Sequence, residues 1–227
     1  MTTAQLFSNE LDTLSHEVLT AQGFVVGTVS GLDRLLGLAH SLGTPIPMRR
    51  SGPLIDELIP QQATETHRNS LSSRHGKGAF PLHTDCAFWV KPPRFLVLNS
   101  PNEASAGAPT RLAQSDWLRE SPTLMNRAST AIFKVVNGSR SFLSNILEPE
   151  LVRFDRDCMI AGSPDSQSLI QEIESAMPNT RVCDLEWSPR LCVVIDNWRM
   201  LHGRASCELL NSQRVLRRIL VMGGKRC

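Results

Sequence analysis

The sequence predicts a mainly β fold, a sandwich or jelly roll with helical flanks. Helical patterns are concentrated early in the chain, and many short strand-like segments joined by turns of varied length follow from residue 80 onward. This order differs from the regular alternation of strands and helices that builds a parallel α/β sheet. The 227 residues, 41% of them hydrophobic, suffice for one core, so we expect a single domain over residues 1–227.

The first part of the chain predicts a helix, a strand and a second helix. Residues 5–19 carry apolar side chains at steps of three and four, which is typical of an amphipathic helix. Residues 24–29 are rich in β-branched and aromatic side chains and predict a strand. Residues 32–42 predict the second helix, and the Pro- and Gly-rich residues 46–81 predict long loops that hold at most short strands.

The rest of the chain predicts strands interrupted by two helices. The helical patterns lie near residues 115–129 and 165–177. The strand-like segments are residues 81–89, 94–99, 110–114, 132–137, 191–196 and 214–222.

The composition excludes several classes of partner. A net charge of +2 at pH 7 gives no long-range field that would select nucleic acid or an anionic membrane. The first residues lack a basic signal region, and every apolar run is far shorter than the roughly 18 residues of a membrane span. The six cysteines are scattered without a Cys-x-x-Cys pair, which favours a reducing compartment. We therefore expect a cytoplasmic protein whose partner is a small-molecule substrate, without a nucleic-acid or membrane partner, and the sequence leaves its oligomeric state open.

Two histidines and an aspartate form a candidate metal site. In the segment PLHTD, residues 81–85, His83 and Asp85 are two residues apart, so on an extended strand both would project from one face and Cys86 from the other. So short a motif is by itself most often an ordinary polar pair. A second histidine, His202, follows a buried-looking strand much later in the chain. Two histidines and one carboxylate are the ligand set of non-heme Fe(II) oxygenases, which leaves coordination positions open.

The last predicted strand carries two arginines among apolar residues. Arg214 and Arg218 share a face with Leu216, Leu220 and Met222 because side chains alternate with a period of two. A buried guanidinium cannot shed its charge, and its planar fork binds a carboxylate through two hydrogen bonds. The pattern therefore suits a dicarboxylic ligand, while a structural ion pair or a surface basic patch stays an equal alternative.

On these residues the chain resembles the Fe(II)- and 2-oxoglutarate-dependent dioxygenases of the taurine dioxygenase and clavaminate synthase-like superfamily. The similarity runs from about Gly23 to Gly223. It implies an α+β, mainly β fold: a double-stranded β-helix (jelly-roll) core with flanking N-terminal and inserted helices. The matching segments, in the family's order and spacing, are residues 38–46, 83–85, 92–94, 107–110, 196–204 and 214–218.

The resemblance also implies roles for individual residues. Thr110 would donate its hydroxyl to the far carboxylate of 2-oxoglutarate, and Arg214 would be the ionic partner of that carboxylate. Arg218 would contact either the cosubstrate or the substrate. The iron ligands would be His83, Asp85 and His202.

The implied activity is hydroxylation of an unactivated C–H bond of a small polar metabolite, with 2-oxoglutarate and O2 consumed and succinate and CO2 released. An aspartate at position 85 disfavours halogenation, whereas desaturation and cyclisation stay open. By analogy, the expected substrate is an amino acid or related acid, free or carrier-bound. Ser73 and Arg74 lie in the loop before residue 80 and are expected to line its pocket, Arg74 binding an acidic group together with Arg218. The alternative is that this loop is an ordinary solvated basic segment.

Two other functions fit parts of the pattern. A zinc-dependent hydrolase could use the same His/Asp/His site, but it would leave Thr110 and Arg214 unexplained. A non-catalytic jelly-roll binding protein would not need an intact triad. Formation of a visible charge-transfer band with Fe(II) and 2-oxoglutarate distinguishes the dioxygenase from both.

Overall fold

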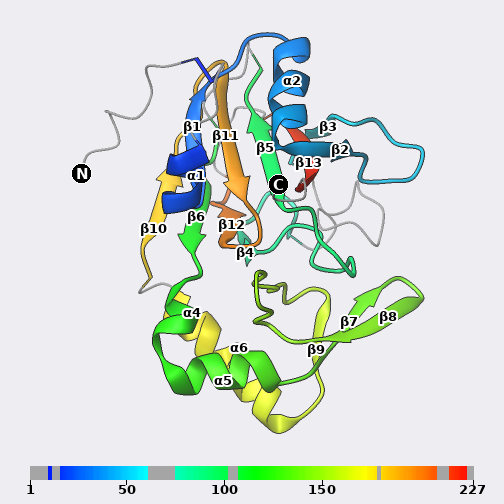
Figure 1. Cartoon of the computed structure of the whole chain (residues 1–227), viewed down its shortest axis with the longest axis vertical. Helices are drawn as coiled ribbons and strands as arrows, with labels where there is room; N and C mark the ends of the chain where they lie inside the picture. Colours follow the sequence, from blue (N-terminus) through cyan, green and yellow to red (C-terminus); the bar gives the residue numbers. More distant parts are fainter. Residues whose placement is uncertain are drawn as a thin grey trace.

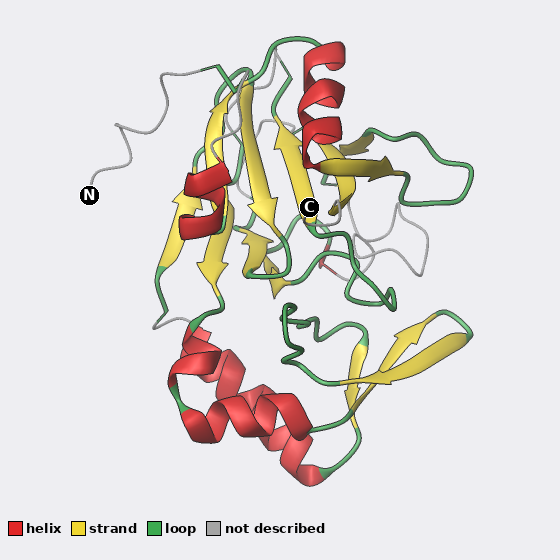
Figure 2. Ribbon diagram, in the orientation of Figure 1, coloured by secondary structure: helices red, strands yellow, loops and turns green. Residues whose placement is uncertain are grey.

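The computed structural model describes residues 10–11, 16–60, 75–101, 107–177, 180–208 and 215–223. Strands in two larger sheets fill the upper part of Figure 1, and a segment richer in helices fills the lower part. Figure 2 shows the same division by type of secondary structure. We refer to the two larger sheets as the sandwich and to residues 115–177, which join two neighbouring strands of one of these sheets, as the insertion.

The largest sheet is antiparallel and is covered by a helix on one face. Helix α2 (Leu32–Leu42) packs on the side where Val97, Ile219 and Val221 lie, while Leu96 and Leu220 point to the opposite side. The alternation of side chains in the last strand is therefore as the period of two predicts. The strands, in spatial order, are β1 (Phe24–Thr28), β11 (Leu191–Asp196), β5 (Phe95–Asn99), β13 (Leu216–Gly223) and β2 (Gly43–Ile46), and β3 (Asp56–Leu58) also pairs with β13.

The second sheet packs face to face with the first. Leu112, Leu185 and Met200 of this sheet join Leu96 and Ile195 of the first in one buried cluster. Burial of these apolar side chains is the main term that holds the two layers together. The spatial order of its strands is β10 (Val182–Leu185), β6 (Thr110–Gln114), β12 (Met200–Arg204) and β4 (Phe80–His83).

The insertion has a core of its own, with a small sheet packed on helices. Phe133 and Val135 of the sheet are buried with Leu169 and Ile173 of the last helix. That helix starts at a capping box formed by Ser163 and Ser166, which satisfies the first free N–H groups. The elements are α4 (Trp117–Glu120), α5 (Pro122–Thr130), β7 (Phe133–Asn137), β8 (Arg140–Ser144), β9 (Met159–Ala161) and α6 (Pro164–Ala176), with sheet order β8-β7-β9.

Several predicted boundaries differ from the structure. Helix α1 (His16–Gln22) extends beyond the predicted end at residue 19, and most of residues 5–15 lie outside the described residues. The helix predicted near 115–129 is two helices, because Pro122 starts α5 and Ser121 caps it. The strand predicted over 81–89 ends at His83. Within the described residues, no helix is both long and apolar enough to cross a membrane.

Candidate active site

His83 and His202 lie side by side on neighbouring strands. Strands β4 and β12 run antiparallel with these two residues as direct partners, and both side chains are buried. Their ring centroids are 4.5 Å apart. His83 Nδ1 lies 2.9 Å from the carbonyl oxygen of Pro81. Because a carbonyl oxygen only accepts, Nδ1 carries the proton, and Nε2 of neutral His83 has a lone pair available to a metal.

Gly203 allows the two strands to approach closely next to His202. A Cβ at this position would meet Phe80 O at 2.5 Å and Pro81 O at 3.0 Å. Both atoms belong to the backbone of the neighbouring strand, so rotation of a side chain could not relieve the clash. The register also shifts between His202 and Arg204, which marks a bulge in this ladder. The sequence HGR at residues 202–204 thus fixes where the second histidine lies.

Asp85 lies in the turn after β4 and not on the strand. Its N–H donates to Asn197 Oδ1 (2.8 Å), and Asn197 Nδ2 donates back to the Asp85 carbonyl (3.1 Å) and to Pro93 O (2.9 Å). Asn197 therefore fixes the backbone of Asp85, a role that sequence reasoning missed although residue 197 lies in a matching segment. The strand alternation predicted for Cys86 was also wrong, because the strand has ended: Cys86 has φ 56°, and its thiol lies 3.7 Å from Asp85 Oδ1.

A buried arginine holds the Asp85 carboxylate. Arg218 Nη1 lies 3.0 Å from Asp85 Oδ2, and Arg218 Nη2 lies 3.0 Å from Asp56 Oδ2 on β3. Burial alone would raise the pKa of Asp85, but its electrostatic interactions with Arg218, His202 and His83 outweigh burial and lower the pKa to about 2. Burial alone would lower the pKa of Arg218, but the interaction with Asp85 outweighs burial, and the pKa of the guanidinium is raised. Both groups are therefore charged at neutral pH.

The donor set has the chemistry of a non-heme iron site. Two adjacent imidazoles and an ionised carboxylate are the groups that such iron prefers. Among the described residues, however, no three His, Cys, Asp or Glu side chains are arranged to hold a metal ion. His83 and His202 are direct partners on paired strands, whereas the Asp85 side chain contacts Arg218. A metal ion held by all three groups would therefore need the Asp85 side chain to move.

The structure describes only some of the remaining predicted site residues. Thr110 is buried on β6, and Trp187 Nε1 donates to its hydroxyl oxygen at 3.0 Å, so the Trp187 indole orients this hydroxyl. Arg218 contacts two acids of the protein, and its contact with a cosubstrate or substrate stays a prediction. Ser73, Arg74 and Arg214 lie outside the described residues.

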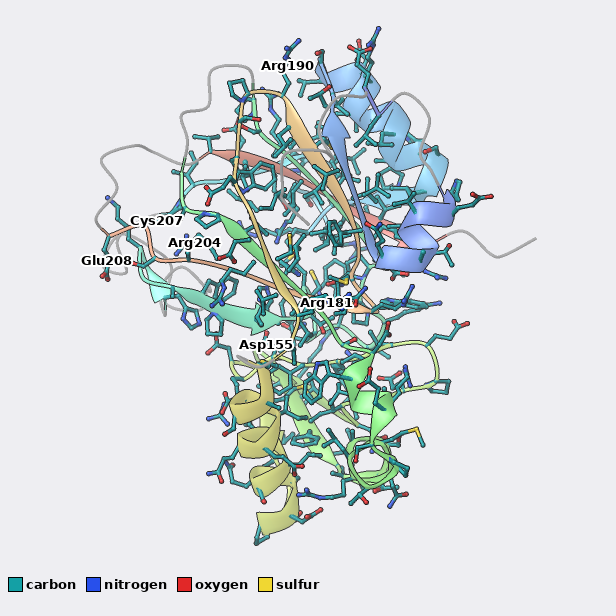
Figure 3. All side chains as sticks on the ribbon, turned by 90° about the vertical axis from the view of Figure 1, so that its left-hand side faces the viewer. Asp155, Arg181, Arg190, Arg204, Cys207 and Glu208 are labelled. Atoms are coloured by element: carbon teal, nitrogen blue, oxygen red, sulfur yellow. The ribbon has the colours of Figure 1, made fainter. Side chains whose placement is uncertain are left out.

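The insertion brings acids to the site that sequence reasoning missed. Asp155 is buried at the junction between sandwich and insertion (Figure 3). Burial raises the pKa of its carboxyl group, although the electrostatic interaction with His83 acts in the opposite direction. Asp157 pairs with His75 Nε2 at 2.6 Å, and the Phe80 ring contacts both His75 and His83. No sequence signal marks these acids, because they lie in a loop without a repeating pattern.

Arg204 anchors the segment that precedes β4. Its Nη2 donates to Gly76 O (2.8 Å) and Gly78 O (2.6 Å), and Cys207 N–H donates to Lys77 O (2.7 Å). Arg204 and Cys207 lie on the same side of the molecule in Figure 3. The end of the loop predicted to line the substrate pocket is thus tied to β12, the strand that carries His202.

Comparisons with known proteins show a family resemblance and a shared fold. A family model described as "Taurine catabolism dioxygenase TauD, TfdA family" matches residues 118–220. No curated protein matches the chain. Asparagine oxygenase, solved with Fe(II), 2S,3S-3-hydroxyasparagine and succinate, is 16% identical with a TM-score of 0.70, over 88% of this chain and 74% of that one.

Two further solved structures have the same fold. The non-heme iron oxygenase OrfP, solved with Fe, succinate and (3S)-hydroxy-L-Arg, has a TM-score of 0.69 at 16% identity and covers 91% of this chain and 78% of its own. PvcB from Pseudomonas aeruginosa has a TM-score of 0.67 at 17% identity and covers 90% and 77%. The resemblance to the taurine dioxygenase superfamily is therefore confirmed: the chain has the mainly β, antiparallel fold of the TauD-like oxygenases.

Proposed function

We propose that the protein is an Fe(II)- and 2-oxoglutarate-dependent dioxygenase that hydroxylates an unactivated C–H bond of a small polar metabolite. The observation that carries this function is the pair of buried imidazoles on β4 and β12, with the ionised Asp85 beside them. The proposed iron ligands are His83, Asp85 and His202. When bound, iron would activate O2 for oxidation of the substrate, with succinate and CO2 released from the cosubstrate.

The other proposed roles rest on the family resemblance. Thr110, oriented by Trp187, and Arg214 would bind the far carboxylate of 2-oxoglutarate. Arg218 would bind an acidic group of the cosubstrate or the substrate, either beside its contact with Asp85 or after that contact breaks. Ser73 and Arg74 would line the substrate pocket.

The proposed substrate is an amino acid or related acid. Two structural neighbours were solved with hydroxylated amino acids, one derived from asparagine and one from arginine. The region around His83 also holds a guanidinium group, Arg218, and a buried carboxyl group, Asp155. A carboxylate and an ammonium group on one small molecule would complement them.

The wider assignments are proposals on the same basis. The sandwich would be the double-stranded β-helix core of a single domain that spans residues 1–227. A cytoplasmic location is proposed from the scattered cysteines, of which Cys86, Cys158, Cys183, Cys192 and Cys207 are free thiols.

An anaerobic titration tests the function. Metal-free protein is mixed with Fe(II) and 2-oxoglutarate, and we expect a visible charge-transfer band that His202→Ala abolishes. His40→Ala is the matched control, because His40 is exposed on α2, on the far face of the largest sheet. Folded wild-type protein without the band would overturn the proposal and favour a zinc hydrolase or a binding protein. Amino acids are then screened for succinate release coupled to O2 uptake.

A further inference from the structure

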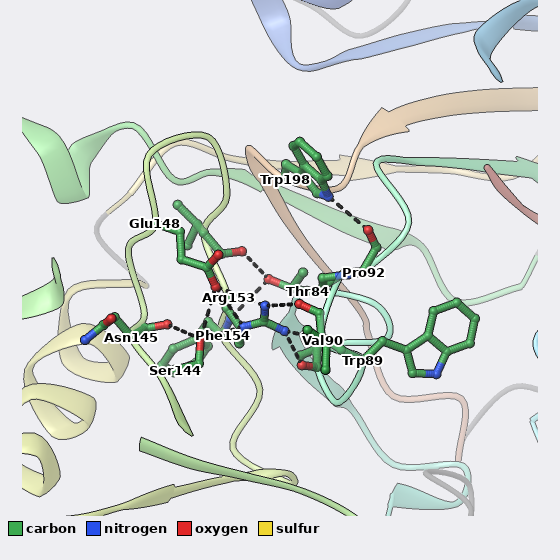
Figure 4. Close-up of polar contacts among 12 residues, drawn as sticks. Thr84, Trp89, Val90, Pro92, Ser144, Asn145, Glu148, Arg153, Phe154 and Trp198 are labelled. Carbon is green, nitrogen blue, oxygen red and sulfur yellow. Dashed lines mark hydrogen bonds and ion pairs between the residues drawn. The ribbon is translucent and has the colours of Figure 1, made fainter. Parts of the chain in front are cut away.

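Arg153 is a fully buried charge in the insertion, and Figure 4 shows its surroundings. Only 1% of its side chain is exposed. The guanidinium cannot lose its proton, so burial is tolerated only if every N–H group has an acceptor. Nε donates to Ser144 Oγ (2.9 Å), and both Nε and Nη2 contact Glu148 Oε1 at 3.2 and 2.9 Å. Glu148 therefore supplies the balancing charge from within the insertion.

The remaining donors of Arg153 point out of the insertion. Nη1 donates to Ala87 O (2.6 Å) and Trp89 O (2.7 Å), and Nη2 donates to Val90 O (3.0 Å). All three carbonyl groups belong to one loop, residues 84–90, which we call the Asp85 loop. Hydrogen bonds from a charged donor are stronger than neutral ones. One side chain of the insertion thus holds three successive points of the loop that carries a proposed iron ligand.

The Asp85 loop lies between this anchor and a second one in the sandwich. On the insertion side, Thr84 Oγ1 also donates to Val152 O (2.8 Å), and Thr84 N–H donates to Phe154 O (2.7 Å). On the sandwich side, Asn197 binds the backbone of Asp85. Because strand pairing ends at His83, these contacts take over from the β ladder in fixing the loop.

We propose that Arg153 is a positioning residue for Asp85: it orients the loop so that the carboxylate can reach the two imidazoles. This inference rests on the proposed function, since it takes Asp85 as a ligand of iron. The described hydrogen bonds of Arg153 all go to the insertion and to the loop backbone, so it would act on the metal site through that backbone. A metal ligand whose supporting contacts are lost typically binds its metal about 10- to 100-fold more weakly.

The test compares Arg153 with an arginine that binds only within the insertion. Arg127 of α5 pairs with Asp165 and Glu172 of α6, and its described contacts do not include the Asp85 loop. The variants are Arg153→Met, Arg153→Lys and, as the matched control, Arg127→Met. For each metal-free variant, we would measure the melting temperature, hydrogen exchange of peptides covering residues 84–90, and the dissociation constant for Fe(II) under anaerobic conditions.

We expect Arg153→Met to raise the Fe(II) dissociation constant about 10-fold or more and to speed up exchange in the Asp85 loop. Arg153→Lys, which keeps the charge but not the fork, should lie between this variant and wild type. Arg127→Met should lower the melting temperature while Fe(II) affinity and loop exchange stay as in wild type.

Three outcomes would overturn the inference. The first is Fe(II) affinity in both Arg153 variants within about twofold of wild type, a change too small for loss of a supporting contact. The second is a loss of Fe(II) affinity in Arg127→Met equal to that in Arg153→Met. Weaker Fe(II) binding would then result from lower overall stability and not from the Asp85 loop. The third is hydrogen exchange in the Asp85 loop of Arg153→Lys that is the same as in wild type. This outcome decides the question if Arg153→Met does not fold. A wild-type protein that does not bind Fe(II) would instead overturn the proposed function, and the exchange experiment would still report on the loop.

Discussion

The sandwich and the insertion contribute to the candidate site in different ways. The sandwich supplies side chains with metal-binding or charged groups, such as His83, His202 and Arg218, at positions fixed by strand register. The insertion acts largely on the backbone of the Asp85 loop, through Arg153 and the Phe154 carbonyl. The sandwich provides most of the chemical groups, whereas the insertion adds Asp155 and Asp157 and fixes the position of Asp85.

This difference predicts two kinds of mutational effect. Removing a donor group from the sandwich removes an interaction that nothing else in the site replaces. Removing a contact of the insertion leaves the donor present but less well oriented, so metal binding weakens without being lost. The predictions that follow test this separation.

The largest effect is expected for His83→Ala. The site would retain one imidazole, and since loss of an outer contact already costs about 10- to 100-fold in metal affinity, loss of a ligand should weaken Fe(II) binding by roughly 100-fold or more. Anaerobic Fe(II) titration measures this. His75→Ala is the matched control, because His75 binds Asp157 of the insertion at 2.6 Å and should keep most of the affinity. Equal losses in the two variants would contradict the division of roles.

A large effect on stability is expected for Gly203→Ala. The new methyl group would meet the Phe80 and Pro81 carbonyl oxygens, so β4 and β12 would have to separate. Overpacking against backbone atoms costs up to about 3 kcal/mol of unfolding free energy. Chemical denaturation measures the change. In Gly37→Ala on α2 the methyl group enters open space, and the better helix propensity should stabilise by about 0.5–1 kcal/mol. A destabilisation of the same size in both variants would show that close approach at β12 is not the cause.

The central strands of the largest sheet could be predicted from the sequence because they are buried on both faces. Strands β5 and β11 lie between other strands and read as continuous apolar runs. Strand β12 could not be predicted, because His202, Gly203 and Arg204 interrupt the alternation of apolar and polar residues that marks a strand. These residues belong to the candidate site or allow β12 to approach β4 closely. The short β9, Met159–Ala161, is set by pairing with β7 and has too few residues for a pattern.

The sequence singles out candidate ligands, but it does not predict their local geometry. His83, Asp85 and His202 are recognisable because few residue types bind iron. That Asp85 lies in a turn depends on Asn197, whose amide pairs with backbone groups far away in the sequence. Arg153 gives no sequence signal, since its partners in the Asp85 loop are carbonyl groups that every residue carries.

The two regions should also respond to pH with opposite sign in the metal-free protein. The pKa of Asp85 falls from 3.8 to about 2 on folding, so its ionised form contributes about 2 kcal/mol of stability above pH 4 that is lost as the pH falls toward 2. The stability difference between wild type and Asp85→Asn should shrink by that amount over this window. The pKa of Asp155 is raised, so acid should favour wild type over Asp155→Asn. Unfolding curves at several pH values measure both differences, and parallel trends would contradict the assigned environments.

The smallest effect is expected for Thr84→Val. Valine has nearly the same shape but loses the hydroxyl that donates to Val152 O and accepts from Phe154 N–H, which leaves two buried polar groups without this partner. The expected cost is about 1 kcal/mol of unfolding free energy, with Fe(II) affinity less affected than in Arg153→Met. Denaturation and Fe(II) titration measure the two quantities.

Thr130→Val is the control, because the Thr130 hydroxyl bonds an exposed carbonyl of its own helix and its loss should change neither quantity. The Thr84 N–H still binds Phe154 O in the variant, so the insertion keeps a backbone contact with the loop. A loss of Fe(II) affinity in Thr84→Val as large as in Arg153→Met would mean that the insertion holds the Asp85 loop mainly through residue 84, and that the three carbonyl contacts of the guanidinium are secondary.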